Sequence, residues 1–177
     1  MRPTKQAVPK WLKAYTIRTF QHSGRKSLLI TGAKGAGKST LLEALIGGAP
    51  VPGVVSEVER GADGLPARVR LRGRGGGEGC LIGVRDTGAM QPRKEALDAG
   101  GVALLRAARQ APGAWAAVDE IGFLESCSPA YLAELRLLLA EKRVLAAVRK
   151  DSTPFLRELF ARSDCFVLDL DQLEAQP

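Results

Sequence analysis

The sequence has few cysteines and no long apolar run. Its three cysteines, Cys80, Cys127 and Cys165, lie far apart in 177 residues and form no Cys-x-x-Cys pair. This sparse, odd number argues against a disulfide framework and favours a reducing compartment. No apolar run approaches the roughly 20 residues of a membrane span, and the N-terminus lacks the pattern of a secretory signal. We therefore expect a cytoplasmic protein without a transmembrane segment.

Acidic residues are absent from the first 26 positions, and this local absence explains the net charge of +7. Seven basic residues lie there: Arg2, Lys5, Lys10, Lys13, Arg18, Arg25 and Lys26. The length predicts one domain, so we divide the chain into a basic N-terminal extension (1–26) and a domain (27–177). Pro9 can open a helix in the extension, with Trp11, Leu12, Tyr15 and Phe20 on one face. Either the extension makes a weak contact with nucleic acid or another anionic partner, or it is a solvated helix whose aromatic residues cap the core.

The remaining chain alternates apolar strand-like runs with helical patterns. Strands are expected at 27–31, 53–58, 67–71, 80–84, 114–118, 143–148 and 165–169, and helices after Gly37, from Pro92 to about Gln110, and at 128–141 and 154–162. This order predicts an α/β fold of three layers, a mostly parallel sheet with helices on both faces. The three runs between 53 and 85, joined by turn residues, predict an inserted antiparallel hairpin.

The segment Gly32–Ser39 fits the pattern Gly-x-x-x-x-Gly-Lys-Ser/Thr between a predicted strand and a helix. Its glycines allow a tight turn whose N–H groups face phosphate oxygens, aided by the helix N-terminus. Lys38, expected in an exposed loop, would contact the β- and γ-phosphates, and the Ser39 hydroxyl would bind Mg²⁺. The predicted nucleotide-binding residues are Gly32, Ala33, Lys34, Gly35, Ala36, Gly37, Lys38, Ser39 and Thr40.

An apolar strand that ends in Asp119-Glu120 supplies the second motif. In P-loop proteins such an Asp holds the Mg²⁺ shell, and an adjacent Glu can take a proton from an attacking water. The carboxyl ends of parallel strands meet at one edge of a sheet, so we expect Thr31, Asp119 and Arg149 to lie together there. Arg149-Lys150 is then either a phosphate sensor or a solvated strand end.

Four segments occur in an order that resembles the THEP-type nucleoside-triphosphatases, a family of small P-loop proteins. They are Gly32–Thr40, Gly53–Val58, Asp119–Glu125 and Val144–Phe155. The resemblance covers about residues 27–170 and implies a RecA/adenylate-kinase-like fold. It implies Lys38 and Ser39 as phosphate and metal residues, Asp119 as the metal-linked acid and Glu120 as the base. Glu57 in the second segment is a further candidate, although the family's Glu-Val-Arg is here Glu57-Val58-Glu59-Arg60.

The resemblance implies slow, Mg²⁺-dependent hydrolysis of ATP, GTP and other nucleoside triphosphates to diphosphate and phosphate. Two other functions stay open from the residues. A small-molecule or nucleotide kinase would use the same P-loop, with Glu120 activating an acceptor hydroxyl. A nucleotide-controlled binding module would use the basic extension to hold nucleic acid or a partner.

Overall fold

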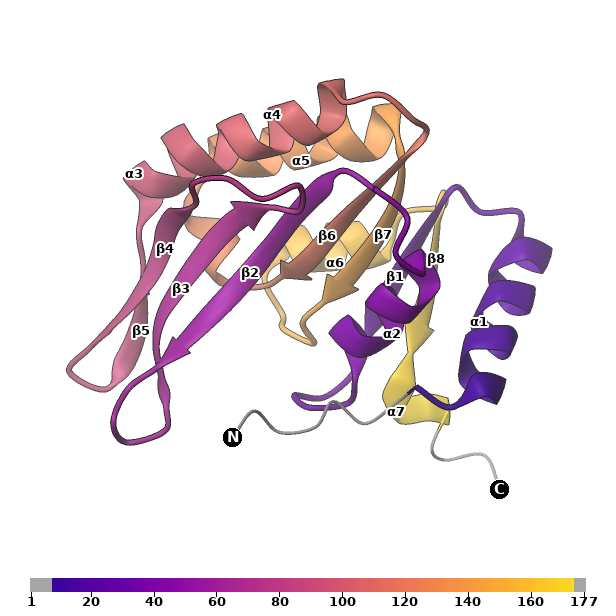
Figure 1. Cartoon of the computed structure of the whole chain (residues 1–177), viewed down its shortest axis with the longest axis horizontal. Helices are drawn as coiled ribbons and strands as arrows, with labels where there is room; N and C mark the ends of the chain where they lie inside the picture. The colour runs from indigo at the N-terminus through magenta and orange to yellow at the C-terminus, as the bar shows by residue number, and fades with distance from the viewer. Residues whose placement is uncertain (1–7, 174–177) are drawn as a thin grey trace.

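The computed structural model describes residues 8–173 and contains one sheet of eight strands with helices on both faces (Figure 1). The strands are β1 (Ser27–Thr31), β2 (Gly53–Arg60), β3 (Pro66–Gly73), β4 (Cys80–Asp86), β5 (Ala89–Pro92), β6 (Trp115–Ile121), β7 (Arg143–Val148) and β8 (Cys165–Asp169). The helices are α1 (Lys10–Ser23), α2 (Lys38–Ile46), α3 (Lys94–Ala96), α4 (Val102–Gln110), α5 (Pro129–Glu141), α6 (Pro154–Phe160) and α7 (Leu170–Leu173). A π-helical turn, η1 (Leu97–Gly101), joins α3 to α4, and a 3₁₀ turn, η2 (Leu124–Cys127), follows β6.

The strand order is β5-β4-β3-β2-β6-β7-β1-β8. From β2 to β8 every neighbouring pair is parallel, whereas β2 to β5 pair antiparallel with one another. The predicted three-layer fold with an antiparallel insertion is therefore confirmed. The insertion also contains a fourth strand, β5, that the sequence patterns did not predict. Because β7 lies between β1 and β6, the two motif-bearing strands are not adjacent.

Two apolar cores cover the two faces of the sheet. Successive side chains of β1 point into different cores. Leu29 packs with α4, α5 and α6 on one face of the sheet, whereas Leu28 and Ile30 pack with α1 and α2 on the other. All three side chains are at most 1% exposed. Burial on both faces accounts for the continuous apolar runs of the central strands.

The first helix belongs to the second of these cores. Phe20 is 8% exposed and lies edge-on to Trp115, with ring centroids 6.2 Å apart. Trp11 and Tyr15 point outward instead. Residue 26 stays a predicted domain boundary, but α1 shares a core with the domain. Arg2 and Lys5 of the predicted extension lie outside the described residues.

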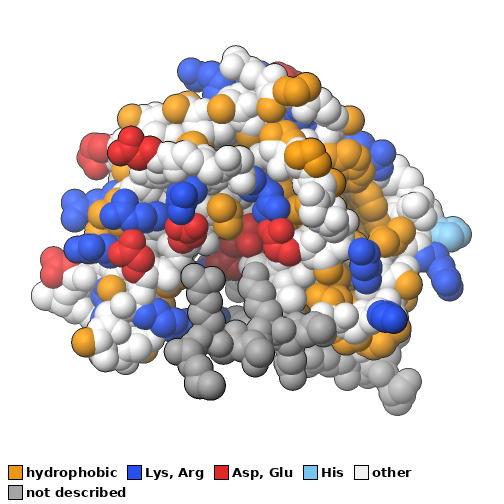
Figure 2. Space-filling model, in the orientation of Figure 1, with side chains coloured by type: hydrophobic (Ala, Val, Ile, Leu, Met, Phe, Trp, Pro, Cys, Tyr) orange, Lys and Arg blue, Asp and Glu red, His pale blue; other side chains and the backbone are white. Residues whose placement is uncertain are grey.

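The arginines of β3 form ion pairs across the antiparallel strands. Arg70 Nε lies 2.8 Å from Glu59 Oε1, and Arg72 Nη1 lies 3.1 Å from Glu57 Oε1. Figure 2 shows the resulting mixture of basic and acidic side chains over the left part of the face, where these strands lie. Arg68, Arg70 and Arg72, which occupy every second position of β3, thus form ion pairs on a solvated face of the sheet.

Candidate active site

The loop between β1 and α2 surrounds a cavity of about 480 Å³ at the carboxyl edge of the sheet. Gly35 and Gly37 have φ of +86° and +91°, a conformation that L side chains rarely adopt, which explains glycine at both positions. The predicted nucleotide-binding residues that line the cavity are Gly32, Ala33, Lys34, Gly35, Gly37, Lys38, Ser39 and Thr40. Ala36 does not line it and packs against the core beside α2. Glu120, Arg149, Lys150 and Asp151 line the rest of the wall, so distant sequence segments meet here.

Lys38 is buried, with only 7% of its surface exposed, so the expectation of an exposed loop position is wrong. Its Nζ donates to the carbonyl oxygens of Gly32 and Ala33, each at 3.1 Å. The tight turn wraps the loop around the lysine stem and holds the ammonium over its own backbone. The charge is therefore already at the cavity wall, held by neutral acceptors that a phosphate can replace.

Ser39 and Asp119 meet although 80 positions separate them. The Ser39 hydroxyl donates to Asp119 Oδ1 at 2.8 Å. Asp119 is 7% exposed, and this burial raises the pKa of its carboxyl above the ordinary value, while the hydrogen bond from Ser39 opposes the rise. A buried carboxylate oxygen beside a hydroxyl oxygen is the donor chemistry that Mg²⁺ prefers. The described residues contain no group of three or more His, Cys, Asp or Glu side chains around one metal position.

Glu120 forms an ion pair with Arg149, whose backbone N–H donates to the Ile121 carbonyl at 2.8 Å. Both side chains also line a second cavity of about 160 Å³, bounded by Ser56, Val58 and Val69 of the antiparallel strands. Ser39, Glu120 and Arg149 are common to the two cavities. Glu120 therefore stands between the predicted phosphate position and a space from which a nucleophile can approach.

Glu125 is an acidic residue of this site that our motif analysis did not single out. It lines the second cavity, is 4% exposed, and accepts a hydrogen bond from the Gly122 N–H at 2.9 Å. Burial raises its pKa from 4.5 to about 7, and the neighbouring Glu120 adds to the rise. The sequence did contain a signal for Glu125, because it is the last residue of the segment Asp119–Glu125 on which the family resemblance rests.

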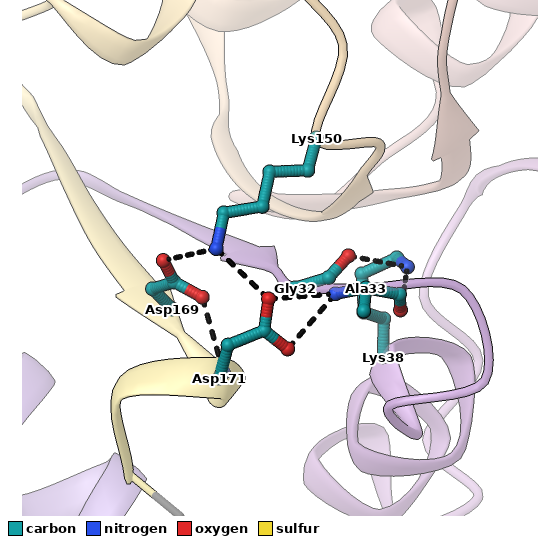
Figure 3. A network of polar contacts seen from close by, with 6 residues as sticks. All are labelled: Gly32, Ala33, Lys38, Lys150, Asp169 and Asp171. Atoms are coloured by element: carbon teal, nitrogen blue, oxygen red, sulfur yellow. Dashed lines mark hydrogen bonds and ion pairs between the residues drawn. The ribbon is translucent and has the colours of Figure 1, made fainter. Parts of the chain in front are cut away.

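A second network anchors the loop from the side of β8 (Figure 3). Lys150 Nζ lies 2.8 Å from carboxylate oxygens of both Asp169 and Asp171. Asp171 in turn accepts the Ala33 N–H, at 2.9 and 3.0 Å from its two oxygens. Lys150 is thus neither a free cation nor a simple solvated strand end. Asp169 is the last residue of β8 and pairs with Thr31, and Asp171 follows two positions later. Their place at the end of the last predicted strand is the signal that could have identified them.

Glu57 is not brought to either cavity among the residues described. It is exposed, and its carboxylate pairs with Arg72 on the outer face of β2 and β3. Arg60 lies one position later than the arginine of the family's Glu-Val-Arg. Its side chain donates to the Gly64 carbonyl at 2.8 Å in the hairpin turn.

The fold and this loop geometry define a P-loop α/β protein. Comparison with known proteins identifies the family, because a family model described as NTPase matches residues 27–175. The chain belongs to this NTPase family, and the resemblance to the THEP-type proteins is confirmed. Among solved structures, THEP1 from the hyperthermophile Aquifex aeolicus is similar at 18% identity and a TM-score of 0.63. That match covers 81% of this chain and 89% of the other. No curated protein sequence matches significantly.

No helix within residues 8–173 combines the length and the apolar character that a bilayer crossing requires.

Proposed function

We propose that the protein hydrolyses the γ-phosphate of ATP, GTP and other nucleoside triphosphates to diphosphate and phosphate, in a Mg²⁺-dependent reaction. One observation carries the proposal. Ser39 and Glu120 line both the P-loop cavity and the adjoining second cavity, and the Ser39 hydroxyl donates to Asp119, which lines the second cavity. Membership of the NTPase family supports the same activity.

Ser39 and Asp119 are the residues that would hold the metal. Their oxygens are adjacent, and the raised pKa of Asp119 indicates a buried carboxylate that a cation would stabilise. Bound Mg²⁺ would neutralise charge on the β- and γ-phosphate oxygens. Asp119 enters this arrangement on β6, and its backbone pairs with Val55 of β2 and Ala147 of β7. The neighbouring strands thus fix the carboxylate opposite the start of α2.

The chain's other groups have separate roles. Lys38 exchanges the carbonyl oxygens of Gly32 and Ala33 for phosphate oxygens, and the backbone N–H groups of the loop bind the remaining phosphate charge. Glu120 accepts a proton from the water that attacks the γ-phosphorus in line. The guanidinium of Arg149 moves its charge from Glu120 toward the phosphoryl group as that group acquires a new bond.

The experiment that tests this proposal is the Glu120→Gln variant. It retains the size of the side chain but cannot accept a proton, so we expect MgATP affinity close to that of the parent and hydrolysis at least roughly 100-fold slower. Glu59→Gln is the matched control, because Glu59 is an exposed, ion-paired acid on the outer face of β2. Melting temperature, affinity and turnover are measured on the same preparation. A Glu120→Gln rate within about threefold of the parent contradicts the base role.

Nucleotide range and acceptor are tested in one assay. Phosphate release from ATP, GTP, CTP and UTP, with and without Mg²⁺, measures the range and the metal dependence. The second cavity favours a kinase as the alternative function, because about 160 Å³ exceeds the 10–15 Å³ that one water needs. Following γ-labelled ATP with glycerol or ribose present distinguishes the two: inorganic phosphate identifies hydrolysis, and a labelled organic phosphate identifies transfer.

A further inference from the structure

The outer face of α1 carries a stripe of aromatic and basic side chains. Phe20 and Thr16 are buried against the domain, which fixes the rotation of the helix. At 3.6 residues per turn, Trp11, Tyr15, Arg18 and His22 then follow one another along the opposite face. All four are exposed, Trp11 at 60% and Tyr15 at 39%. We call these four residues the outer stripe.

Among the described residues, the basic side chains around the outer stripe form no ion pair. Within residues 8–173, Lys10, Lys13, Arg18 and Arg25 have no acidic partner, and residues 1–26 contain no Asp or Glu. Figure 2 shows Lys and Arg side chains without acidic neighbours on the right of the face, where α1 lies. This differs from the antiparallel strands, where Arg70 and Arg72 are paired with carboxylates.

Not every basic residue of the segment is available. Lys26 Nζ donates to the carbonyl oxygens of Leu139 and Ala140 near the end of α5, so its charge serves the fold. The available charges are therefore those carried by α1 and by Arg25 just after it. The same helix carries the two exposed aromatic rings of Trp11 and Tyr15, which lie one helical turn, roughly 6 Å, apart along the axis.

We infer that the outer stripe binds single-stranded nucleic acid. Unpaired bases stack on Trp11 and Tyr15, and the phosphates that flank them lie near Lys10 and Arg18. Aromatic side chains within a positive surface are the shared feature of proteins that bind single strands without sequence preference. Because Phe20 packs α1 onto the domain, the backbone that carries both rings is already ordered before binding.

The geometry favours a single strand over a duplex or a membrane. Bases inside a duplex are already stacked on one another and cannot stack on side chains, so a duplex would contact only the charges. A helix that lies in a membrane surface needs a broad apolar face. In α1 the apolar positions Leu12 and Phe20 pack into the protein, and half of the outer stripe consists of the polar residues Arg18 and His22.

The outer stripe does not line the P-loop cavity, so its binding is measurable apart from hydrolysis. The test uses the full chain and a fluorescein-labelled oligothymidylate, followed by fluorescence anisotropy over a series of salt concentrations. We expect binding at low salt, and we expect Trp11→Ala and Tyr15→Ala each to weaken it about 5- to 150-fold. Leu65→Ala and Leu137→Ala are matched controls, because they truncate exposed apolar side chains on other elements.

Charge is tested separately. Arg18→Ala should reduce the slope of log affinity against log salt by about 0.7, whereas Arg93→Ala, an exposed arginine beside α3, should leave the slope unchanged. We expect every variant to hydrolyse ATP at the rate of the parent. If the parent binds the oligonucleotide but does not hydrolyse ATP, that result contradicts the proposed function and leaves this inference intact. Four results would each overturn the inference. The chain could bind a duplex of the same length as tightly, or bind the oligonucleotide equally well after both aromatic substitutions. It could also bind only phosphatidylserine vesicles, or fail to bind the oligonucleotide at low salt.

Discussion

Arg149 and Glu120 pair with each other across the line where the two cavities of the site meet. They come from the ends of β7 and β6, which are neighbours in the sheet, so the pairing follows from the strand order. In the proposed reaction the pair must separate, because Glu120 has to accept a proton and Arg149 has to face the phosphoryl group. The resting ion pair thus holds both groups near the reacting atoms.

The Arg149→Ala variant tests this relationship. We expect turnover to fall at least about 10-fold with MgATP affinity nearly unchanged, because the charge contributes as the transition state forms. Arg162→Ala is the control, since Arg162 pairs with Asp164 and lines neither cavity. Turnover that rises in Arg149→Ala would show that the arginine only restrains Glu120.

Gly53 determines how closely β2 approaches β6, the strand that carries Asp119. A Cβ at Gly53 would lie 1.8 Å from the Ala117 carbonyl oxygen, which is backbone and cannot rotate away. Gly53→Ala should therefore lower the free energy of unfolding by about 1–3 kcal/mol. Gly75→Ala is the matched control, because a Cβ there meets open space. Equal melting temperatures for the two variants would contradict the close approach.

The elements that the sequence predicted well are those with a strong local signal. The strand expected at 27–31 and the helix expected after Gly37 coincide with β1 and α2, because a short apolar run and a glycine-rich turn are local features. The fold followed from the alternation of such elements. β5 was missed because Ala89–Pro92 is short, contains a proline and has no apolar alternation; its pairing with β4 is a tertiary effect.

Site residues could be predicted from the sequence only where a motif specifies both the residue type and the spacing. Ser39 of the first motif donates a hydrogen bond to Asp119 of the second, and their roles in binding a metal stay predictions. The partners of Lys150 were not predicted, because Asp169 and Asp171 act only through the position of β8 beside β1. The burial of Lys38 was also missed, because the enclosing turn is a three-dimensional property of the glycine-rich loop.

Phe20 tests whether α1 is part of the folded domain. Its ring is 8% exposed and lies 6.2 and 6.3 Å from the rings of Trp115 and Phe166. Phe20→Ala should lower the free energy of unfolding by about 3–5 kcal/mol. Trp11→Ala, which truncates an exposed aromatic on the same helix, should change it by at most about 0.5 kcal/mol. A neutral Phe20→Ala in urea unfolding would support residue 26 as a true domain boundary.

Glu125 makes stability depend on pH in a direction opposite to that of most carboxylates. Its pKa is about 7 in the folded protein, against 4.5 for the ordinary value, chiefly because of burial. Between these values the folded protein keeps a proton that the unfolded chain has lost. The folded state then binds more protons, so this group's contribution to stability falls as pH rises from about 4.5 to about 7.

Glu125→Gln removes this penalty, and its amide oxygen can still accept the Gly122 N–H. The variant should match the parent near pH 4.5 and exceed its stability above pH 7, by on the order of 3 kcal/mol. Urea unfolding of both proteins at several pH values measures the difference, with Glu78→Gln, at an exposed loop position, controlling for the loss of one acidic side chain. A stability difference that stays constant across this range would show that Glu125 is ionised in the folded protein. Its charge would then be held by Arg149, the cation whose interaction lowers its pKa, and Arg149→Ala would destabilise the parent more at high pH than at low pH.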